Sequence, residues 1–371
     1  MKEYYELAKT IHKELCVIPA PSHYEDRRAA YCTEKLKSYG FENVFVDGAK
    51  NVICEIRAEQ SDKTVIFAAH TDVVFPDMDL LPLDENDETI YCPGCGDDTV
   101  CVAQLMSAMK KIRDAGKKPV HNVVFTLNSC EEGLGNLKGI RAVMERYGDS
   151  VAAFFTFDGQ YRAVVDRSVG SHRYKVTVKT KGGHSFNDFG NENAARVLAK
   201  GIGMIYDLPV PQGGKTTYNV GMISGGTSVN TIVQEASMLC EYRSESAENL
   251  EYMRLEFQKI FAAMEKEAAV EVEVVGDRPG MKNVDAADQK ALSDLVVQTQ
   301  HKYGGAEPVR KSGSTDCNVP HSMGIPAVCV GTYLGGGEHT RQEWVKKSSI
   351  SVGVDIITEI IETYFRQGGQ P

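Results

Sequence analysis

The stretch from residue 64 to residue 70, TVIFAAH, is an uninterrupted apolar run that ends in a histidine. A strand buried on both faces of a sheet has such a sequence, because neither face meets water. Similar runs are HNVVFTL (121–127) and AAFFTF (152–157), and the segment TVCVAQLMSAMKKIRDAG (99–116) has helical periodicity. This alternation predicts an α/β fold built on a buried sheet.

The pattern changes near residue 170, where HRYKVTVKTKG alternates polar and apolar residues as a half-buried strand does. A helix, two strands, a second helix and a last strand follow. The order βαββαβ predicts a ferredoxin-like sandwich at residues 171–281. A helix (286–303), a strand (326–331) and a C-terminal helix (348–366) then resume the α/β style. We therefore expect one mixed-sheet α/β domain from residues 1–170 and 282–371, interrupted by the smaller domain.

Composition excludes several classes of protein. A chain of 371 residues is expected to form two domains. Its formal net charge is -10 and it has no long Lys/Arg tract, so neither nucleic acid nor an anionic membrane is an expected partner. The first 22 residues lack the apolar core of a signal peptide. Ten cysteines without such a signal predict reduced thiols and a cytoplasmic location.

Candidate metal ligands follow the ends of the predicted strands, where open α/β sheets build their sites, and these are His70, Glu131, Glu132, Asp158 and His339. Asp97 joins them at the mouth of a helix that follows another loop. Carboxylates and imidazoles gathered at one sheet edge would be costly to desolvate without a cation. Their number suits two metals about 3.5–4 Å apart that share one carboxylate. The donor types favour Zn²⁺, although Co²⁺ or Mn²⁺ could bind the same set.

Six short motifs occur in order along the chain, and they are HTDVV (70–74), GCGDD (94–98), CEEGLG (130–135), FDG (157–159), KGGHS (181–185) and GEHT (337–340). The ordered set resembles the co-catalytic zinc metallohydrolases that include peptidase T, carboxypeptidase G and aminoacylase. The resemblance spans nearly the whole chain. It implies a zinc-hydrolase catalytic domain with an inserted lid domain.

The resemblance also implies roles for single residues. It makes Asp97 the carboxylate that bridges two zinc ions. It completes the two ligand sets with one pair each, His70 with Asp158 and Glu132 with His339. Asp72 would orient the His70 imidazole from behind. Glu131, which adjoins a ligand, would act as the general base that takes a proton from the attacking water.

In the inserted domain the resemblance points to three residues. His184 would lie over the substrate carbonyl oxygen and stabilise the developing oxyanion. Asn230 would donate a hydrogen bond to the substrate, and Arg243 would hold a substrate carboxylate unless it forms an ordinary salt bridge. A β-edge and an exposed helix in this domain favour a homodimer through the lid.

Within this family, GCGDD resembles the form of the tripeptidase branch, which implies a hydrolase of short peptides. Thr99 stands where that branch usually has Lys. An N-acyl-amino-acid deacylase or a carboxypeptidase is therefore the alternative, with an acylated amino acid or a peptide as substrate. A non-catalytic binding module would not need the complete ligand set and Glu131.

The segment YCPGCGDDTVC (91–101) keeps a second class of function open, because a C-x-x-C pair is typical of thiol redox sites and of structural zinc sites. Asp97 and Asp98 beside the cysteines would oppose thiolate formation, whereas the predicted helix N-terminus and nearby zinc would favour it. We expect the three cysteines to be small apolar neighbours of the metal site. Asp98 and Thr99 are expected to cap the following helix.

Overall fold

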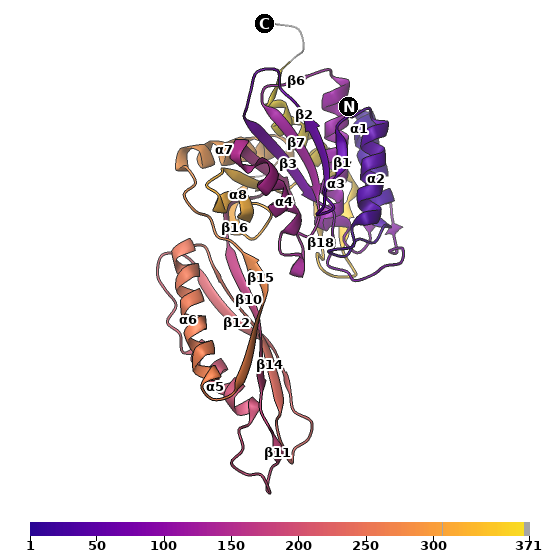
Figure 1. Ribbon diagram of the computed structural model, residues 1–371. Helices are drawn as coiled ribbons and strands as arrows, with labels where there is room; N and C mark the ends of the chain where they lie inside the picture. The colour runs from indigo at the N-terminus through magenta and orange to yellow at the C-terminus, as the bar shows by residue number, and fades with distance from the viewer. Residues whose placement is uncertain (306, 367–371) are drawn as a thin grey trace. The chain divides into compact units, whose positions relative to one another are not determined.

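The computed structural model describes residues 1–305 and 307–366, and Figure 1 shows their ribbon. Contacts divide the chain into two compact units. Unit 1 consists of Met1–Ser168 and Lys282–Pro371, and unit 2 of Val169–Met281. The sequence predicts the first boundary two residues later, after residue 170. Both ends of the chain therefore contribute to one unit, and the other is inserted between them.

A mixed eight-stranded sheet forms the centre of unit 1, in the order β1-β2-β7-β3-β8-β17-β9-β16. The four inner strands β7, β3, β8 and β17 run parallel to their neighbours in this group, whereas β1, β2 and β9 introduce antiparallel pairs. The strands are β1 (Val44–Val46), β2 (Val52–Ile56), β3 (Thr64–His70), β7 (Asn122–Asn128), β8 (Val151–Phe157), β9 (Ala163–Ser168), β16 (Val309–Gly313) and β17 (Ala327–Val330). This confirms the mixed α/β fold.

Strand β3 explains why the sheet needs helices on both faces. All seven of its residues are buried. Val65, Phe67 and Ala69 pack into one hydrophobic cluster, whereas Ile66 and Ala68 pack into another, because successive side chains of a strand point to opposite faces. The apolar run 64–69 therefore supplies both cores of the unit.

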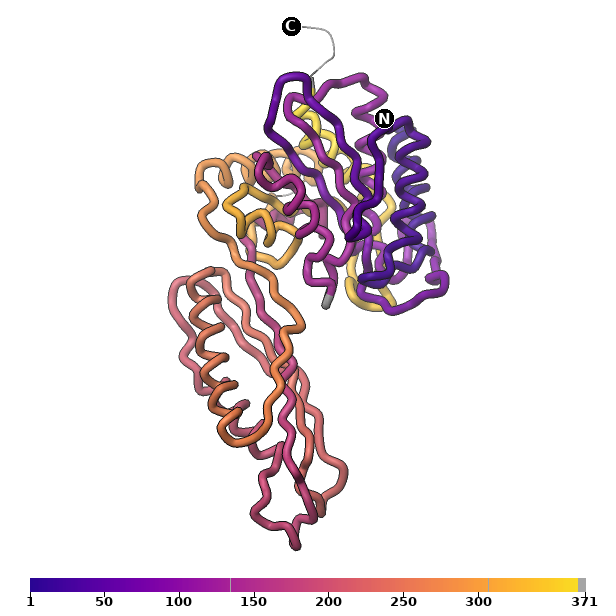
Figure 2. Tube along the Cα trace, in the orientation of Figure 1, coloured from indigo at the N-terminus to yellow at the C-terminus, as the bar shows by residue number. Residues whose placement is uncertain are grey.

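Helices cover the two faces unequally. The larger cluster includes residues of α1, α2, α3, α7 and α9, and the smaller one includes residues of α4 and α8. Figures 1 and 2 show the course of the backbone. The helices are α1 (Lys2–Cys16), α2 (Asp26–Ser38), α3 (Cys101–Asp114), α4 (Lys138–Tyr147), α7 (Ala286–Gly304), α8 (Asn318–Ser322) and α9 (Lys347–Glu362), with short turns η1 (Cys95–Val100), η2 (Gly133–Gly135) and η3 (Gly148–Ser150). Apolar side chains of these helices are thus buried on both faces of the sheet.

Smaller sheets complete unit 1. One has the order β18-β19-β5-β4 and another pairs β20 with β6. Their strands are β4 (Asp84–Glu85), β5 (Thr89–Tyr91), β6 (Lys118–Pro119), β18 (Gly335–Gly336), β19 (Trp344–Lys346) and β20 (Phe365–Arg366). The C-terminal helix was expected to reach residue 366, which is wrong. It ends at Glu362, and Phe365 then pairs with Pro119.

Unit 2 follows the order β10, α5, β12, β14, α6, β15, which is the predicted βαββαβ order. Its antiparallel sheet has the order β12-β14-β10-β15. Residues of α5 and α6 share a hydrophobic cluster with alternate residues of β10 and β14. The elements are β10 (Gly170–Lys179), β11 (Gly183–His184), α5 (Ala194–Tyr206), β12 (Thr216–Gly225), β13 (Thr231–Ile232), β14 (Glu235–Ser244), α6 (Ala247–Glu265) and β15 (Ala269–Arg278).

None of the helices in the described part of the chain combines the length and the apolar character needed to cross a bilayer.

Two buried histidines of unit 1 make acid stability a testable property. His12 Nε2–H donates to the carbonyl oxygen of Cys95 (2.7 Å), and His321 Nε2–H donates to that of Ala327 (2.9 Å) while its Nδ1 accepts from the Ser168 hydroxyl (2.7 Å). Burial lowers the pKa of each imidazole to about 4. Both rings are therefore neutral in the folded protein at pH 6.

We expect the metal-free protein to lose stability as the pH falls from about 6.5 to about 4. The unfolded chain binds protons on these imidazoles at pH 6.5 and the folded chain does not, so acid favours unfolding. Protonation of each histidine lowers the free energy of unfolding by about 3 kcal/mol over this window, at about 1.4 kcal/mol per pKa unit. Urea unfolding at several pH values measures the slope. His321→Gln should flatten it, whereas exposed His301→Gln should not; equal slopes would contradict the assignment.

Candidate metal centre

The predicted ligands of unit 1 come together at one edge of the large sheet. The register pairs Phe67 of β3 with Phe125 of β7 and Phe155 of β8, and stacks their rings at centroid distances of 5.5 and 5.4 Å. With this register His70 ends β3, and Asp158 directly follows β8. The carboxyl ends of parallel strands thus bring two predicted ligands to the same place.

The carboxylate of Asp97 lies between two imidazoles. Its Oδ1 is 3.1 Å from His70 Nε2, and its Oδ2 is 3.1 Å from His339 Nε2. His339 Nε2 is also 3.3 Å from Glu132 Oε1. One ligand atom each of His70, Asp97 and Glu132 lie within 4.8 Å of one another. The arrangement therefore presents one oxygen of Asp97 to each histidine.

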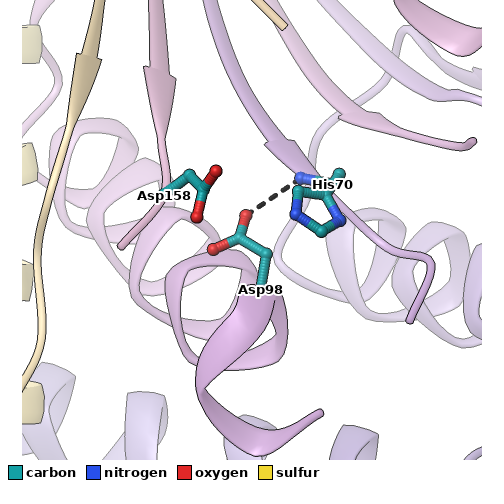
Figure 3. Close-up of side chains that lie close together, drawn as sticks. All are labelled: His70, Asp98 and Asp158. Carbon is teal, nitrogen blue, oxygen red and sulfur yellow. Dashed lines mark hydrogen bonds between the residues drawn. The ribbon is translucent and has the colours of Figure 1, made fainter. Parts of the chain in front are cut away.

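Asp158 forms a second group with His70 and Asp98, whose ligand atoms also lie within 4.8 Å of one another. Figure 3 shows the Asp98 carboxylate between the other two side chains. Asp98 Oδ2 accepts a hydrogen bond from the backbone N–H of His70 (3.0 Å). Sequence reasoning missed Asp98 as a member of this cluster, although its place beside Asp97 in GCGDD was a signal.

The expectation that Asp98 and Thr99 cap helix α3 is wrong. The cap position belongs to Val100 and has no side-chain hydrogen bond. The Thr99 hydroxyl instead donates to the carbonyl oxygen of Gly94, within the loop that carries Asp97. Gly94 itself has a φ of 73°, a left-handed conformation that glycine adopts without a steric penalty. Polar side chains of this segment therefore fix the loop rather than the helix.

The electrostatics of the cluster favour a bound cation. Burial and then the charge of Asp97 raise the pKa of Asp158 to about 7, and burial also raises the pKa of Asp98. Hydrogen bonds to Asp97 and Glu132 raise the pKa of His339 to about 11. The raised pKa values of Asp158 and Asp98 mean that their negative charge is unfavourable in this buried cluster, and the raised pKa of His339 reflects the carboxylates around it. Divalent metals supply positive charge, and the oxygen and nitrogen donors fit Zn²⁺.

Asp72 braces the neighbouring loop of Glu131 and Glu132. Its Oδ1 accepts from the backbone N–H of Glu131 (2.9 Å) and its Oδ2 from that of Glu132 (3.0 Å). His70 Nδ1 lies 3.1 Å from the carbonyl oxygen of Asp72 and 3.5 Å from its Oδ1. The imidazole is therefore oriented mainly by the Asp72 backbone, and this leaves Nε2 directed at Asp97. Glu131, in the braced loop, is 6% exposed.

The cysteines do not form a site of their own. All ten are free and buried. In the described part of the chain, none belongs to a group of potential metal ligands. Burial raises the pKa of Cys95 and Cys101, which is the opposite of what a reactive thiol needs. The Cys-x-x-Cys pair is therefore packing around the Asp97 loop.

Three predicted residues lie in unit 2. His184 is exposed, and its Nδ1 accepts from the backbone N–H groups of Phe186 and Asn187. Asn230 is close by, since its carbonyl oxygen accepts from Ser185 N–H (3.0 Å). Arg243 donates to both carboxylate oxygens of Glu241 (2.8 and 3.1 Å), which is the salt bridge named as the alternative. Within unit 2, His184 and Asn230 therefore lie close together, whereas Arg243 forms its salt bridge with Glu241.

A family model described as peptidase family M20/M25/M40 matches residues 66–363. The chain belongs to this family. It is a metallopeptidase, as the motifs predicted. The protein is 27% identical to the uncharacterized protein YqjE of Bacillus subtilis over 334 residues, which cover 85% of each chain. It is 23% identical to the putative succinyl-diaminopimelate desuccinylase DapE of Mycobacterium tuberculosis over 92% of this chain and 94% of that one.

Solved structures have the same fold. The aminopeptidase PepT of Bacillus cereus superposes with a TM-score of 0.77 at 23% identity, and the match covers 96% of this chain and 98% of that one. Similarity at this level shows the fold. Support for a metal site in this chain comes from the group of candidate ligands described above.

Proposed function

We propose that this M20/M25/M40 metallopeptidase cleaves amide bonds of short peptides with two metal ions per chain. The observation that carries the proposal is the Asp97 carboxylate, which offers one oxygen beside His70 and the other beside His339. A carboxylate in that position is suited to two cations at once. The GCGDD form of the loop and the fold shared with PepT support peptides as substrates.

The remaining donors divide into two sets. His70 and Asp158 complete the first set, and Glu132 and His339 complete the second. Bound Zn²⁺ ions, or Co²⁺ or Mn²⁺ in their place, would acidify a water molecule and polarise the scissile carbonyl group. The Asp72 brace keeps the backbone of Glu131 and Glu132 in place while this happens.

Glu131 is the general base in this proposal. It adjoins the ligand Glu132 in a buried loop, so its carboxylate can take the proton of the attacking water. The same group then delivers the proton to the leaving amine. All atoms are accounted for in this hydrolysis, because the water provides the hydroxyl of the new acid and the hydrogen of the new amine.

Unit 2 serves as the lid in this proposal. His184 donates to the carbonyl oxygen of the substrate as negative charge develops there, and Asn230 adds a second donor. Arg243 takes the carboxylate of the substrate in exchange for Glu241. A homodimer through this unit and a cytoplasmic location complete the proposal, the latter because all ten thiols are free.

An N-acyl-amino-acid deacylase is the second candidate. The similarity to the putative desuccinylase DapE favours it, and so does Thr99, which replaces the Lys usual in the tripeptidase branch. Both candidates share the attack of water on an amide carbonyl, and they differ in the group on the acyl side of the scissile bond.

A substrate panel decides between them. We expect protein loaded with Zn²⁺ or Co²⁺ to hydrolyse di- and tripeptides, and a chelator to abolish this turnover. The assay follows the release of amino acids, with acetylated and succinylated amino acids as the parallel set. Turnover of the acylated set alone would replace the peptidase with the deacylase, and activity that survives the chelator would contradict both.

A further inference from the structure

Glu343 is a buried acid near the metal cluster to which no role has yet been given. It lies four residues after His339 and directly before β19, and its side chain is 1% exposed. Its Oε2 accepts from the backbone N–H of Gly94 (2.6 Å). Its Oε1 accepts from the N–H groups of Gly96 (2.9 Å) and Asp97 (2.8 Å). The carboxylate thus collects three backbone donors from the loop that carries Asp97.

The main chain strengthens this contact. Cys92 N–H donates to the carbonyl oxygen of Glu343 (3.3 Å), and Trp344 pairs with Tyr91 across β19 and β5. The segment that supplies His339 is therefore tied to the segment that supplies Asp97 through both backbone and side chain. These tethers fix two metal-ligand loops with respect to each other.

Gly96 shows how closely the loop is fitted to this carboxylate. A Cβ atom at Gly96 would lie 2.8 Å from Glu343 Oε1 and 2.9 Å from the Tyr333 hydroxyl. Both neighbours are buried side chains that have little freedom to move away. A residue with a side chain at position 96 must therefore displace Glu343 or the loop itself.

Asp72 holds the other ligand loop in the same way, through the N–H groups of Glu131 and Glu132. Two buried carboxylates thus grip the backbone of the two acidic loops, and the ligand side chains stay directed at the cluster. A carboxylate that binds backbone N–H groups in this way leaves the ligand side chains free. It limits the positions that a neighbouring side chain can reach.

We propose that Glu343 is a positioning residue, which holds the Asp97 carboxylate midway between His70 and His339 so that both metal ions can share it. The proposal rests on the two-metal site of the proposed function. Because Asp97 serves both ions, a shift of its loop should weaken both binding events and distort both coordination shells.

The test uses Glu343→Gln in the full chain, because the amide keeps the shape and replaces one acceptor oxygen with an NH₂ group that faces backbone N–H donors. We expect Co²⁺ to bind 10- to 100-fold more weakly, the loss typical when a group that supports a ligand is removed. We also expect a changed Co²⁺ absorption spectrum and, at saturating metal, a lower kcat with little change in KM. Glu359→Gln is the matched control, since Glu359 is a partly buried acid that binds Lys302 and Tyr303 on α7.

Gly96→Ala disturbs the same contact from the opposite side, so it should reproduce the weaker Co²⁺ binding and the altered spectrum. Parental Co²⁺ affinity and spectrum in folded Glu343→Gln, even with a lower Tm, would overturn the proposal and leave Glu343 a stabilising residue alone. Metal binding is measured apart from turnover. A parental protein that binds Co²⁺ but hydrolyses no amide would refute the proposed function and not the role of Glu343.

Discussion

Glu131→Gln is expected to keep both metal ions and to lose turnover by about 10²–10⁴-fold, the usual contribution of a positioned general base. The amide cannot accept the proton of the attacking water. The Asp72 brace should survive, because it binds the backbone N–H of residue 131 and not its side chain. Metal content by elemental analysis and kcat on the best peptide of the panel measure the two properties separately.

The control for this variant is Glu145→Gln, which removes an exposed carboxylate on α4 of the same unit. It should keep the parental kcat and metal content. Glu131→Gln with the parental rate would remove the base assignment. Loss of the metals together with turnover would instead make Glu131 a ligand.

The inner strands could be predicted from the sequence because of where they lie. β3 is covered on both faces, so selection for burial left an unbroken apolar run and the strand ends at the histidine where that run stops. The clustering of His70 and Asp158 could be predicted by the same reasoning, since parallel strands end at a common edge. Their role as metal ligands stays a prediction.

Helix α2 shows where this reasoning fails. Its buried residues include Arg28, which interrupts the apolar stripe that would have marked the helix. Two nitrogens of the guanidinium, Nε and Nη1, donate inside the protein to the carbonyl oxygens of Ile18 and Thr71 and to the Thr99 hydroxyl. A buried charge with partners from distant segments has no signature in a local window, so the bounds of this helix could not be predicted.

Glu343 and Asp98 escaped prediction for a related reason. The bonds from Glu343 to Gly94, Gly96 and Asp97 connect residues almost 250 positions apart. Nothing in the sequence EWVKK (343–347) shows whether Glu343 binds backbone N–H groups or faces solvent. Asp98 was visible beside Asp97, but helical capping is the commoner use of an Asp at that place. The fold alone reveals that its carboxylate turns toward His70 and Asp158.

Substitution of each aspartate of the adjacent pair Asp97 and Asp98 separates the shared ligand from its neighbour. Asp97→Asn is expected to abolish turnover and to reduce the bound metal from two ions per chain to one or none, because the amide offers one neutral oxygen where two charged ones face His70 and His339. Asp98→Asn should retain both ions and most of the activity. Asp98 is the neighbour and not the shared carboxylate in this proposal, since its Oδ2 already accepts from the backbone N–H of His70.

The amide oxygen of the Asp98→Asn variant can also keep the bond that Asp98 accepts from His70 N–H, so the end of β3 should not move. Calorimetric titration with Zn²⁺ gives the stoichiometry of each variant, and thermal unfolding of the metal-free proteins checks that both fold. The decisive comparison is between the numbers of Zn²⁺ ions that the two variants bind. If Asp98→Asn loses the second ion and Asp97→Asn keeps it, Asp98 and not Asp97 is the shared carboxylate, because Asp98 already forms a group of potential ligands with His70 and Asp158.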